Sequence, residues 1–488
     1  MPEAGLVLGV DLGTTSLKGS LFDVQGRLIA DHSTVYPTTR HADGRVEQDP
    51  GDWLDAFWTV VDVLLDGRDP AGLIALGICS QVNTNVFVDD EGRALAPAIT
   101  WLDGRCEGEA ARLDALVDDT ARHRWWPSGM AISASHTLPR MAWMAAVHPG
   151  IWNRTAKVLS PKDFLLRHLT GQWTADAPAA FDLVDMQGRY IPELLALVPG
   201  AAARLAPLAS YRSVIGRVSH PRLPGCRAMV VNGTMDALGC LFGSGASGPG
   251  EGSYISGTSE IIAMIGDRPG SAPGIVSFVP VDDWHVQAGP TQSGGDTLRW
   301  LAELLSLPFQ DVLALAATAD RSGAGDEILF LPHLEGERAP FWDSRARGSF
   351  LGLRSSDGPA ALALAALEGV ALSAGLIFSG CAQAVGHRPD ALYLGGKGNR
   401  SDLWAQIRAD VLGIPLHRVD CLDTGAVGAG IMAGVGAGLF PSIAEASRAF
   451  VRIERTFVPD PARRARYDRL TRRYLVAYQQ LKPFYALE

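Results

Sequence analysis

Apolar residues in the first eighty positions occur in runs typical of strands, interrupted by one stretch with helical spacing. Residues 6–10 form a continuous apolar run, which predicts a strand covered on both faces. A second strand is expected to end near Asp23, a third to span 27–35, and a fourth to span 73–81. Between the last two, a helix is expected to start at Asp49, with an inner stripe of Trp53, Phe57, Val61 and Leu64. This β-β-β-α-β order predicts an α/β fold with a mixed sheet.

The rest of the chain repeats parts of this pattern. Helices dominate a middle region rich in Trp, Pro and turns. The Gly/Pro-rich segment 247–252 marks a domain boundary, so we expect domains at 1–246 and 247–488. After it, two apolar strands flank a Ser-Gly-Thr-Ser turn, which we interpret as a second copy of the opening hairpin. Near the end, residues 390–420 predict a strand, a Gly-rich turn, a helix and a strand.

The turn of the opening hairpin carries candidate chemistry. Gly13 permits a tight turn, and Thr14, Thr15 and Ser16 offer hydroxyl and N–H groups that suit phosphate oxygens. Asp11 would repel a phosphate unless a cation lay between them, and Mg²⁺ prefers oxygen ligands. An ordinary hairpin with a polar turn is the alternative, and the turn lacks the G-x-x-x-x-G-K-[ST] pattern of a Walker A loop.

Composition narrows the class of protein. A chain of 488 residues is long enough for two large domains. A net charge of −10 argues against a nucleic-acid partner. The Arg-rich segment 461–474 is interpreted as the solvated face of a helix whose other face carries Tyr467, Leu470, Tyr474 and Tyr478. None of the six cysteines forms a CxxC pair, so a zinc site or a disulfide framework is not expected.

The sequence gives no sign of targeting to a membrane. The N-terminus enters a strand without the basic and apolar regions of a signal peptide. The segment 360–377 is the most apolar stretch, but Glu368 interrupts it, and a buried helix is expected there. We therefore predict a cytoplasmic protein without a membrane partner.

Taken in order, motifs along nearly the whole chain resemble the FGGY family of carbohydrate kinases, and most of all its xylulokinase-like members. The motifs are VDLGTTSLK, WLDGR, SPKDFLLRHLTG, NGTMDALG, ISGTSE, SGGDTLRWL, FLPHLEGERAPFWDSRARGSFLGL and LGGKGNRSDLWAQIRADVLGIP. The resemblance implies two actin-like, ribonuclease-H-like domains of the ASKHA type with a cleft between them. It further implies ATP and Mg²⁺ as cofactors and a small-molecule sugar as substrate. A homodimer is also compatible with the resemblance.

The resemblance also implies roles for residues of the first domain. Asp236 would be the general base that takes the proton of the acceptor hydroxyl, although a helix N-cap is the common role of such an aspartate. Asp11 would hold Mg²⁺, and Lys18 would neutralise charge on the transferring phosphoryl group. Asp103 and Arg105 match the substrate-side motif, where Arg105 either binds substrate oxygens or braces Asp103. Trp101 would stack on the sugar or belong to the core.

Nucleotide contacts are implied in both hairpins and in two Gly-rich turns. The helix that follows Gly295 can face an anion or a base with free N–H groups, and the turn at 395–399 lets a flat ligand approach, although such βα turns are common. Lys397 departs from the small residue usual there. The residues implied are Gly13, Thr14, Thr15, Gly257, Thr258, Ser259, Gly294, Gly295, Gly395, Gly396, Lys397 and Asn399.

The residues expected to contact the sugar differ from those of xylulokinases. Their usual Gln-Met-His-Gly is replaced by Gln81, Val82, Asn83 and Thr84, and an amide at Asn83 can both donate to and accept from hydroxyls. Phosphorylation of D-xylulose to the 5-phosphate is the leading prediction; D-ribulose, another ketose, erythritol and glycerol are the alternatives. An actin- or Hsp70-like ATPase and an inactive sugar sensor are more remote, because the WLDGR motif, Asp11, Lys18 and Asp236 are all present.

Overall fold

The computed structural model describes residues 5–319 and 328–487. Their contacts divide the chain into two compact units. The first unit contains residues 1–247, 278–282 and 423–451, and the second contains 248–277, 283–422 and 452–488. Both units contain mixed sheets with helices, as the α/β prediction requires.

The first unit is built on a six-stranded sheet in the order β10-β11-β6-β1-β2-β3. Its central strand β1 (Leu6–Leu12) is buried throughout and pairs antiparallel with β2 (Ser16–Asp23) and parallel with β6 (Leu73–Ser80). The flanking strands are β3 (Leu28–Val35), β10 (Val214–Arg217) and β11 (Met229–Val231). The predicted helix is α1 (Pro50–Leu64), and the Asp49 side chain caps it by accepting from the N–H of Gly51.

Smaller elements complete the first unit. Two small sheets form from β4 (Thr39–Arg40), β5 (Val46–Gln48) and β8 (Ala98–Ile99), and from β7 (Val86–Val88) and β9 (Lys157–Leu159). The helices are α2 (Glu107–Asp114), α3 (Asp119–Trp125), α4 (Thr137–Val147), α5 (Pro149–Arg154), α6 (Pro161–Thr170), α7 (Pro192–Leu195) and α8 (Asp236–Gly243), with 3₁₀ turns η1 (Pro70–Gly72) and η2 (Ala202–Arg204).

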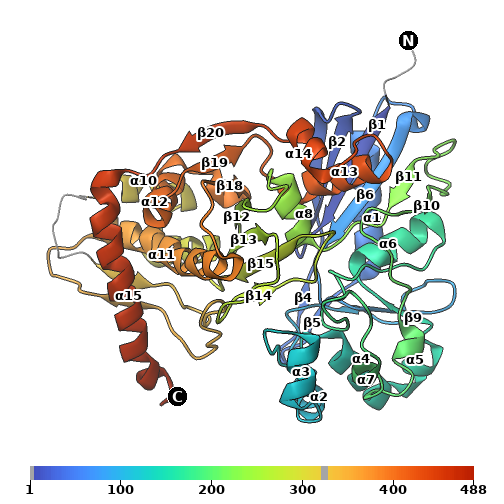
Figure 1. The fold of residues 1–488 in the computed structure, drawn as a ribbon, viewed down its shortest axis with the longest axis horizontal. Coiled ribbons are helices and arrows are strands. Elements are labelled where there is room, and N and C mark those ends of the chain that lie inside the picture. The colour runs from blue at the N-terminus through green and yellow to red at the C-terminus, as the bar shows by residue number, and fades with distance from the viewer. Residues whose placement is uncertain (1–4, 320–327, 488) are drawn as a thin grey trace. The chain divides into compact units, whose positions relative to one another are not determined.

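A late segment of the chain returns to the first unit. Helices α13 (Thr424–Gly436) and α14 (Ile443–Phe450) lie beside strands β1 and β2 (Figure 1). A Cβ on Gly9 would lie 2.0 Å from the carbonyl oxygen of Ala426, and one on Gly77 would lie 2.3 Å from that of Ala429. Strand glycines therefore let the small-residue helix α13 pack directly on the sheet. The sequence boundary at residue 246 did not anticipate this return.

The second unit repeats the strand order of the first. Its seven-stranded sheet runs β14-β15-β13-β12-β18-β19-β20. Strand β12 (Gly252–Ser256) pairs antiparallel with β13 (Glu260–Gly266) and parallel with β18 (Leu392–Gly395), as β1 does with β2 and β6. The remaining strands are β14 (Val276–Ser277), β15 (His285–Pro290), β19 (Leu416–Val419) and β20 (Ile453–Phe457). The shared topology supports the predicted internal duplication.

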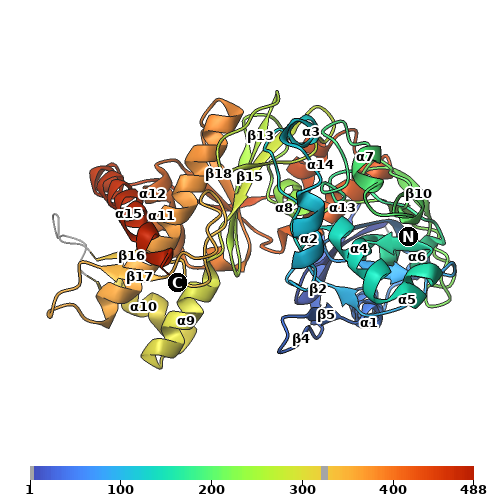
Figure 2. The ribbon, with the colours of Figure 1, turned by 90° about the horizontal axis from the view of Figure 1, so that it is seen from below.

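Helices cover this second sheet. The long helix α11 (Pro359–Val385) could cross a membrane by length and composition, but 78% of its apolar window is buried inside the structure, as expected for a core helix. Helix α15 (Arg464–Tyr485) lies beside α11 and α12 (Asp402–Leu412) and buries Tyr467, Leu470, Tyr474 and Tyr478, as predicted (Figure 2). The other elements are α9 (Gly295–Leu305), α10 (Phe309–Ala317), η3 (Lys397–Arg400), η4 (Pro461–Arg463), β16 (Leu329–Leu331) and β17 (Ser349–Leu351).

Candidate active site

Two charged side chains meet across the opening hairpin. Asp11 of β1 and Lys18 of β2 are register partners, and Lys18 Nζ lies 3.4 Å from Asp11 Oδ2. The same Nζ lies 3.9 Å from Asp423 Oδ1 at the start of α13. The negative charge of Asp11 raises the pKa of Lys18 above its ordinary value despite burial. Lys18 is therefore a permanent cation near the start of β2.

Asp236 lies at the first position of α8, near the same cluster. Burial raises its pKa to about 7, and the charge of Asp11 contributes in the same direction. The N–H of Ala237 donates to Asp236 Oδ1 over 2.7 Å, and together with Lys18 it limits this rise. A carboxyl that titrates near neutral pH is well matched to accept and release a proton.

The residues near Asp11 fit a magnesium ion that takes few protein ligands. No group of three or more His, Cys, Asp or Glu side chains able to hold a metal occurs in residues 5–319 and 328–487. Mg²⁺ usually binds one or two carboxylates and completes its shell with water and phosphate oxygens. Asp11 is 4% exposed and already faces Lys18, so it suits contact through water.

Two hydrogen bonds hold the turn between β1 and β2 in place. Gly13 N–H donates to the Ser16 carbonyl oxygen over 3.1 Å, and the Tyr36 hydroxyl donates to the Gly13 carbonyl oxygen. Thr14 is half-buried and Thr15 is exposed. This leaves the outer side of the turn accessible to an anion while its inner side is fixed.

Asp103 and Arg105 form an internal ion pair. Arg105 donates to both carboxylate oxygens of Asp103, over 2.8 and 2.6 Å, and to Glu47 over 2.7 Å. The N–H of Val46 donates to Asp103 over 2.6 Å. Burial alone would raise the pKa of Asp103, but the hydrogen bonds from Arg105 and Val46 lower it below its ordinary value. Of the two roles considered for Arg105, the structure therefore contains the brace of Asp103.

The loop after β6 contains Gln81, Val82 and Asn83, which were predicted to bind the sugar. Asn83 has φ of +55°, a left-handed conformation that asparagine tolerates better than most residues. Buried Arg140 donates to the carbonyl oxygen of Asn83 and, over 2.9 Å, to Asn85 Oδ1. Within the described residues, the Oδ1 atom of Asn83 is buried and has no hydrogen-bond partner. An orphaned acceptor of this kind suits a hydroxyl donor from a ligand.

The second hairpin turn packs on the start of α9. Gly295 N–H donates to the Gly257 carbonyl oxygen over 2.9 Å. A Cβ on Gly294 would lie 2.7 Å from backbone atoms of Ser259, and one on Gly295 would lie 2.6 Å from the Gly257 carbonyl oxygen. The structure thus brings together five predicted nucleotide-binding residues within the second unit, namely Gly257, Thr258, Ser259, Gly294 and Gly295.

The predicted adenosine turn is anchored to the same hairpin. Gly396 has φ of +84°, and a Cβ there would lie 2.2 Å from the Ser256 carbonyl oxygen. Asn399 is fully buried and donates to the Gly395 carbonyl oxygen over 2.6 Å, so its side chain fixes the turn from inside. Lys397 is exposed.

A buried ion pair joins these two turns. Arg408 of α12 donates to Glu260 Oε1 over 2.9 Å, to Ser256 Oγ over 2.8 Å and to Asn399 Oδ1 over 2.7 Å. Arg408 and Glu260 are both fully buried, and the guanidinium lies 3.9 Å from the Trp404 ring centre. The pair therefore fixes the base of β12 and β13 against the turn after β18.

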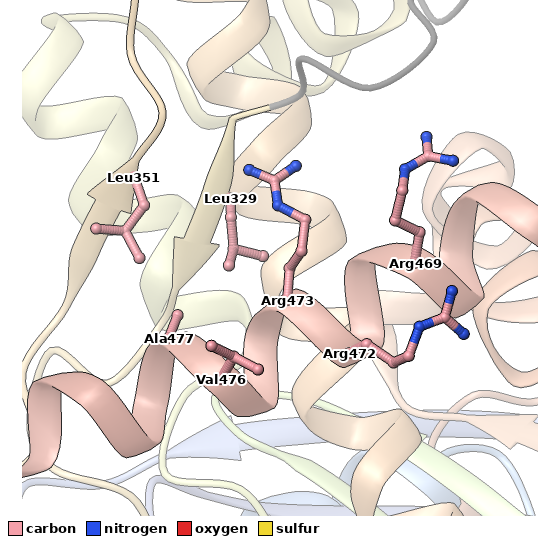
Figure 3. A pocket seen from close by; sticks show the side chains of 7 residues that line it. All are labelled: Leu329, Leu351, Arg469, Arg472, Arg473, Val476 and Ala477. Atoms are coloured by element: carbon pink, nitrogen blue, oxygen red, sulfur yellow. The ribbon is translucent and has the colours of Figure 1, made fainter.

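A separate hollow of about 350 Å³ lies on α15. Its lining includes Leu329 of β16, Leu351 of β17 and three arginines of the helix, Arg469, Arg472 and Arg473 (Figure 3). None of the predicted site residues lines it, so it is not part of the candidate active site.

Several charged residues in or next to the candidate site were not predicted from the sequence. Asp423 precedes a small-residue helix, and its position 412 residues after Asp11 gave no local signal. Arg140 and Arg408 resemble ordinary helix-surface arginines in the sequence, yet both are fully buried. Glu260 follows the Gly-Thr-Ser turn directly, and a charged residue inside an apolar strand was the available signal.

Models of both domains of the FGGY carbohydrate kinases match this chain, the N-terminal domain over residues 6–243 and the C-terminal domain over 252–437. The chain belongs to the FGGY family of carbohydrate kinases. It is 30% identical to the xylulose kinase of Escherichia coli (strain K12), over 99% of this chain and 100% of that one. It is 31% identical to the glycerol kinase of Thermus brockianus, over 88% of this chain and 90% of that one.

The fold of this kinase also matches a solved member of the family. The crystal structure of xylulose kinase from Rhodospirillum rubrum superposes with a TM-score of 0.87 at 28% identity, covering 99% of this chain and 100% of that one. The predicted two-domain α/β fold and the predicted family are therefore confirmed, and the chain is an ATP-dependent sugar kinase.

Proposed function

We propose that this kinase transfers the γ-phosphoryl group of ATP to a hydroxyl of a ketose, with D-xylulose giving the 5-phosphate as the first candidate. The relatives named xylulose kinase support this substrate, since the E. coli protein aligns over the whole chain. We also propose that the reaction takes place in the cytoplasm, where ATP is available.

The observation that carries the proposal is Asp236, which lies at the start of α8 with a pKa raised to about 7. Phosphoryl transfer requires a group that accepts the hydroxyl proton as the oxygen attacks phosphorus. A carboxylate with a pKa near 7 is largely deprotonated at slightly alkaline pH and still basic enough to take that proton. We assign Asp236 as the general base.

Charge around the transferring phosphoryl group would be balanced by the hairpin of the first unit. Lys18 is a fixed cation, and the Thr14 and Thr15 turn offers donors to phosphate oxygens. Mg²⁺, when bound near Asp11, would neutralise further charge on the phosphate oxygens. Transfer needs little covalent help from the protein, so these positions carry most of the catalytic effect.

We propose that the nucleotide binds to the second unit. The start of α9 holds the turn at Gly257–Ser259, because the N–H groups of Gly295 and Asp296 donate to the carbonyl oxygens of Gly257 and Thr258. The hydroxyls of Thr258 and Ser259 would then meet the phosphates. The turn at Gly395–Asn399 would receive adenosine, because Gly396 brings the backbone close without a side chain.

The polar groups of Asn83 and Asp236 support a polyhydroxy substrate. Asp103 and Arg105 are occupied with each other, which makes them positioning residues in our proposal. Asn83 Oδ1 is an unpaired buried acceptor in the described residues, and Asp236 is the second group available to hydroxyls. We propose that the substrate pairs one hydroxyl with each.

A panel assay tests the proposal. ADP release would be measured with Mg-ATP and, in turn, D-xylulose, D-ribulose, gluconate, erythritol and glycerol. Asp236→Asn serves as the matched control because it preserves the side-chain shape. We expect one ketose to give the highest kcat/KM and the variant to lose about 10³-fold or more.

Other results would change the assignment. A strong response to a polyol alone would retain the mechanism and reassign the pocket. No response above acceptor-free hydrolysis would favour an ATPase or a sugar sensor. Retention of near-normal turnover by Asp236→Asn would remove that residue from its role.

A further inference from the structure

Five residues of the first unit form a closed ring of hydrogen bonds through side-chain and backbone atoms. Trp101 Nε1 donates to Thr14 Oγ1 over 3.0 Å, and the Trp101 backbone N–H donates to Thr84 Oγ1 over 3.2 Å. Thr84 donates to Gln81 Oε1 over 3.2 Å, and Gln81 Nε2 donates to Gln48 Oε1 over 2.9 Å. Gln48 Nε2 closes the ring by donating to the Thr14 carbonyl oxygen over 2.6 Å. The ring joins the loop after β6, which we propose binds the sugar, to the turn between β1 and β2, which we propose binds phosphate.

Gln48 can occupy this ring in one orientation only. The indole N–H of Trp53, which lies 3.2 Å from Gln48 Oε1, is a donor and never an acceptor. The Thr14 carbonyl oxygen is an acceptor and never a donor. The second N–H of Gln48 donates to Thr38 Oγ1 over 2.8 Å, so all four hydrogen-bonding positions of the amide are filled. At 2% exposure, the amide has no water to replace a lost partner.

The ring also sets the direction of the Thr14 hydroxyl. Because its oxygen accepts from the Trp101 indole, its single proton must point away from Trp101. Thr14 is half-buried. With one lone pair of its oxygen occupied by Trp101, the hydroxyl keeps its proton available to donate to a phosphate oxygen.

We propose that Gln48 is a positioning residue for phosphoryl transfer. Through this ring, Gln48 couples the contact of the sugar with Trp101 to the contact of the phosphate with Thr14. The inference rests on the proposed function. Gln48 holds the Thr14 backbone, Trp101 orients the Thr14 hydroxyl, and Gln81 with Thr84 connects the two. A sugar that contacts Trp101 therefore stabilises the orientation in which the Thr14 hydroxyl donates to the phosphate.

A structural role alone makes a different prediction. If Gln48 only satisfied buried groups, its replacement would lower stability and leave kcat of the folded fraction unchanged. If it positions Thr14, kcat falls while the KM for the acceptor changes little, because small displacements of a catalytic contact reduce rate strongly.

The test compares Gln48→Met with Gln287→Met, which removes a similarly buried amide (3% exposed) from β15 of the second unit. Both variants are assayed at a temperature below their unfolding transitions. We expect Gln48→Met to lower kcat by about 10- to 100-fold with the acceptor KM within about threefold. Gln287→Met should remain within about twofold of the wild type in kcat.

Trp101→Phe provides a second variant that keeps an aromatic ring and removes the indole donor. We expect kcat to fall in this variant too. If both residues act through Thr14, the double variant should lose no more than about the larger single loss. Losses that multiply would overturn the coupling even if each single variant is impaired, and Trp101→Phe decides the matter if Gln48→Met does not fold.

The proposed function and the positioning role of Gln48 can be overturned separately. If the wild type phosphorylates no acceptor of the panel, the proposed function is overturned and the positioning role with it. If the wild type is active and Gln48→Met retains kcat within about twofold, only the positioning role is overturned.

Discussion

Lys18 Nζ lies 3.4 Å from Asp11 Oδ2, across one register pair of the β1–β2 hairpin. Opposite charges held this close on neighbouring strands keep a cation and a carboxylate together beside the turn at residues 13–15. If that turn binds phosphate, as we propose, Lys18 offsets the charge of Asp11 that would otherwise repel it.

Asp11→Asn should weaken the use of magnesium. The amide retains one oxygen ligand and loses the negative charge that attracts Mg²⁺ or its water shell. We expect the Mg²⁺ concentration for half-maximal rate to rise about tenfold, measured by titration at fixed total ATP. Asp31→Asn, which alters an exposed carboxylate on β3, is the control. A titration identical to that of the wild type would exclude Asp11 from metal contact.

Asp236 should make turnover depend on pH. Its pKa of about 7 means that the base is protonated and inactive below neutrality. We expect log kcat/KM to rise with unit slope up to about pH 7 and then to level off. A flat profile between pH 5 and 8, by contrast, would mean that another group accepts the proton.

The same pKa has a consequence for stability. Burial raises the pKa of Asp236 above its value in the unfolded chain, so the folded state binds a proton more tightly and loses stability as pH rises toward 7. Asp236→Asn removes this loss. We expect it to be more stable than the wild type by about 2 kcal/mol at pH 8, since each pKa unit corresponds to about 1.4 kcal/mol and partial exposure reduces the total. Urea unfolding at pH 8 and at pH 4, where the difference should vanish, measures the effect.

Gly294→Ala should impair nucleotide binding. Its Cβ would lie 2.7 Å from the backbone of Ser259, so the second hairpin turn must move. We expect the KM for ATP to rise about tenfold while the acceptor KM remains within about twofold. Gly248→Ala, where a Cβ meets nothing within 4 Å, is the matched control. Equal ATP affinity in both variants would show that the turn does not bind nucleotide.

Asn83→Gly should weaken acceptor binding. Glycine tolerates the φ of +55° and deletes the amide, so the backbone is preserved while the unpaired Oδ1 is lost. We expect the acceptor KM to rise about tenfold, equivalent to one lost hydrogen bond, without change in the KM for ATP. Unchanged acceptor affinity would place the sugar elsewhere in the first unit.

Arg408→Met should destabilise the second unit. Removing the cation leaves Glu260 buried and unpaired, and such changes typically cost about 3–5 kcal/mol. Arg299→Met, from the exposed pair with Asp296, should change stability by less than about 1 kcal/mol. The double variant Arg408→Met/Glu260→Gln should recover part of the loss. Similar unfolding free energies for the two single variants would contradict the buried pairing.

Much of this architecture was determined by the sequence alone, because local patterns carried it. The apolar run before Asp11, the Gly-Thr-Thr turn and the second strand that follows fix the hairpin, since side chains alternate along a strand and small residues are needed at a tight turn. The helix capped by Asp49, the buried α11 and the inner tyrosines of α15 follow in the same way from spacing. The order of motifs also sufficed to indicate the family.

Only the tertiary structure decided which distant residues meet. Nothing local shows that Asp423 returns to Lys18, or that Arg140 and Arg408 are buried, because a guanidinium is stabilised inside by carbonyls and carboxylates contributed from far along the chain. The same holds for the contacts of the Gln48 amide with Thr14 and Gln81, which lie more than thirty residues away on either side of it in the chain. Spacing in sequence predicts faces of single elements, whereas the pairing of buried polar groups is set by how the sheets and helices pack.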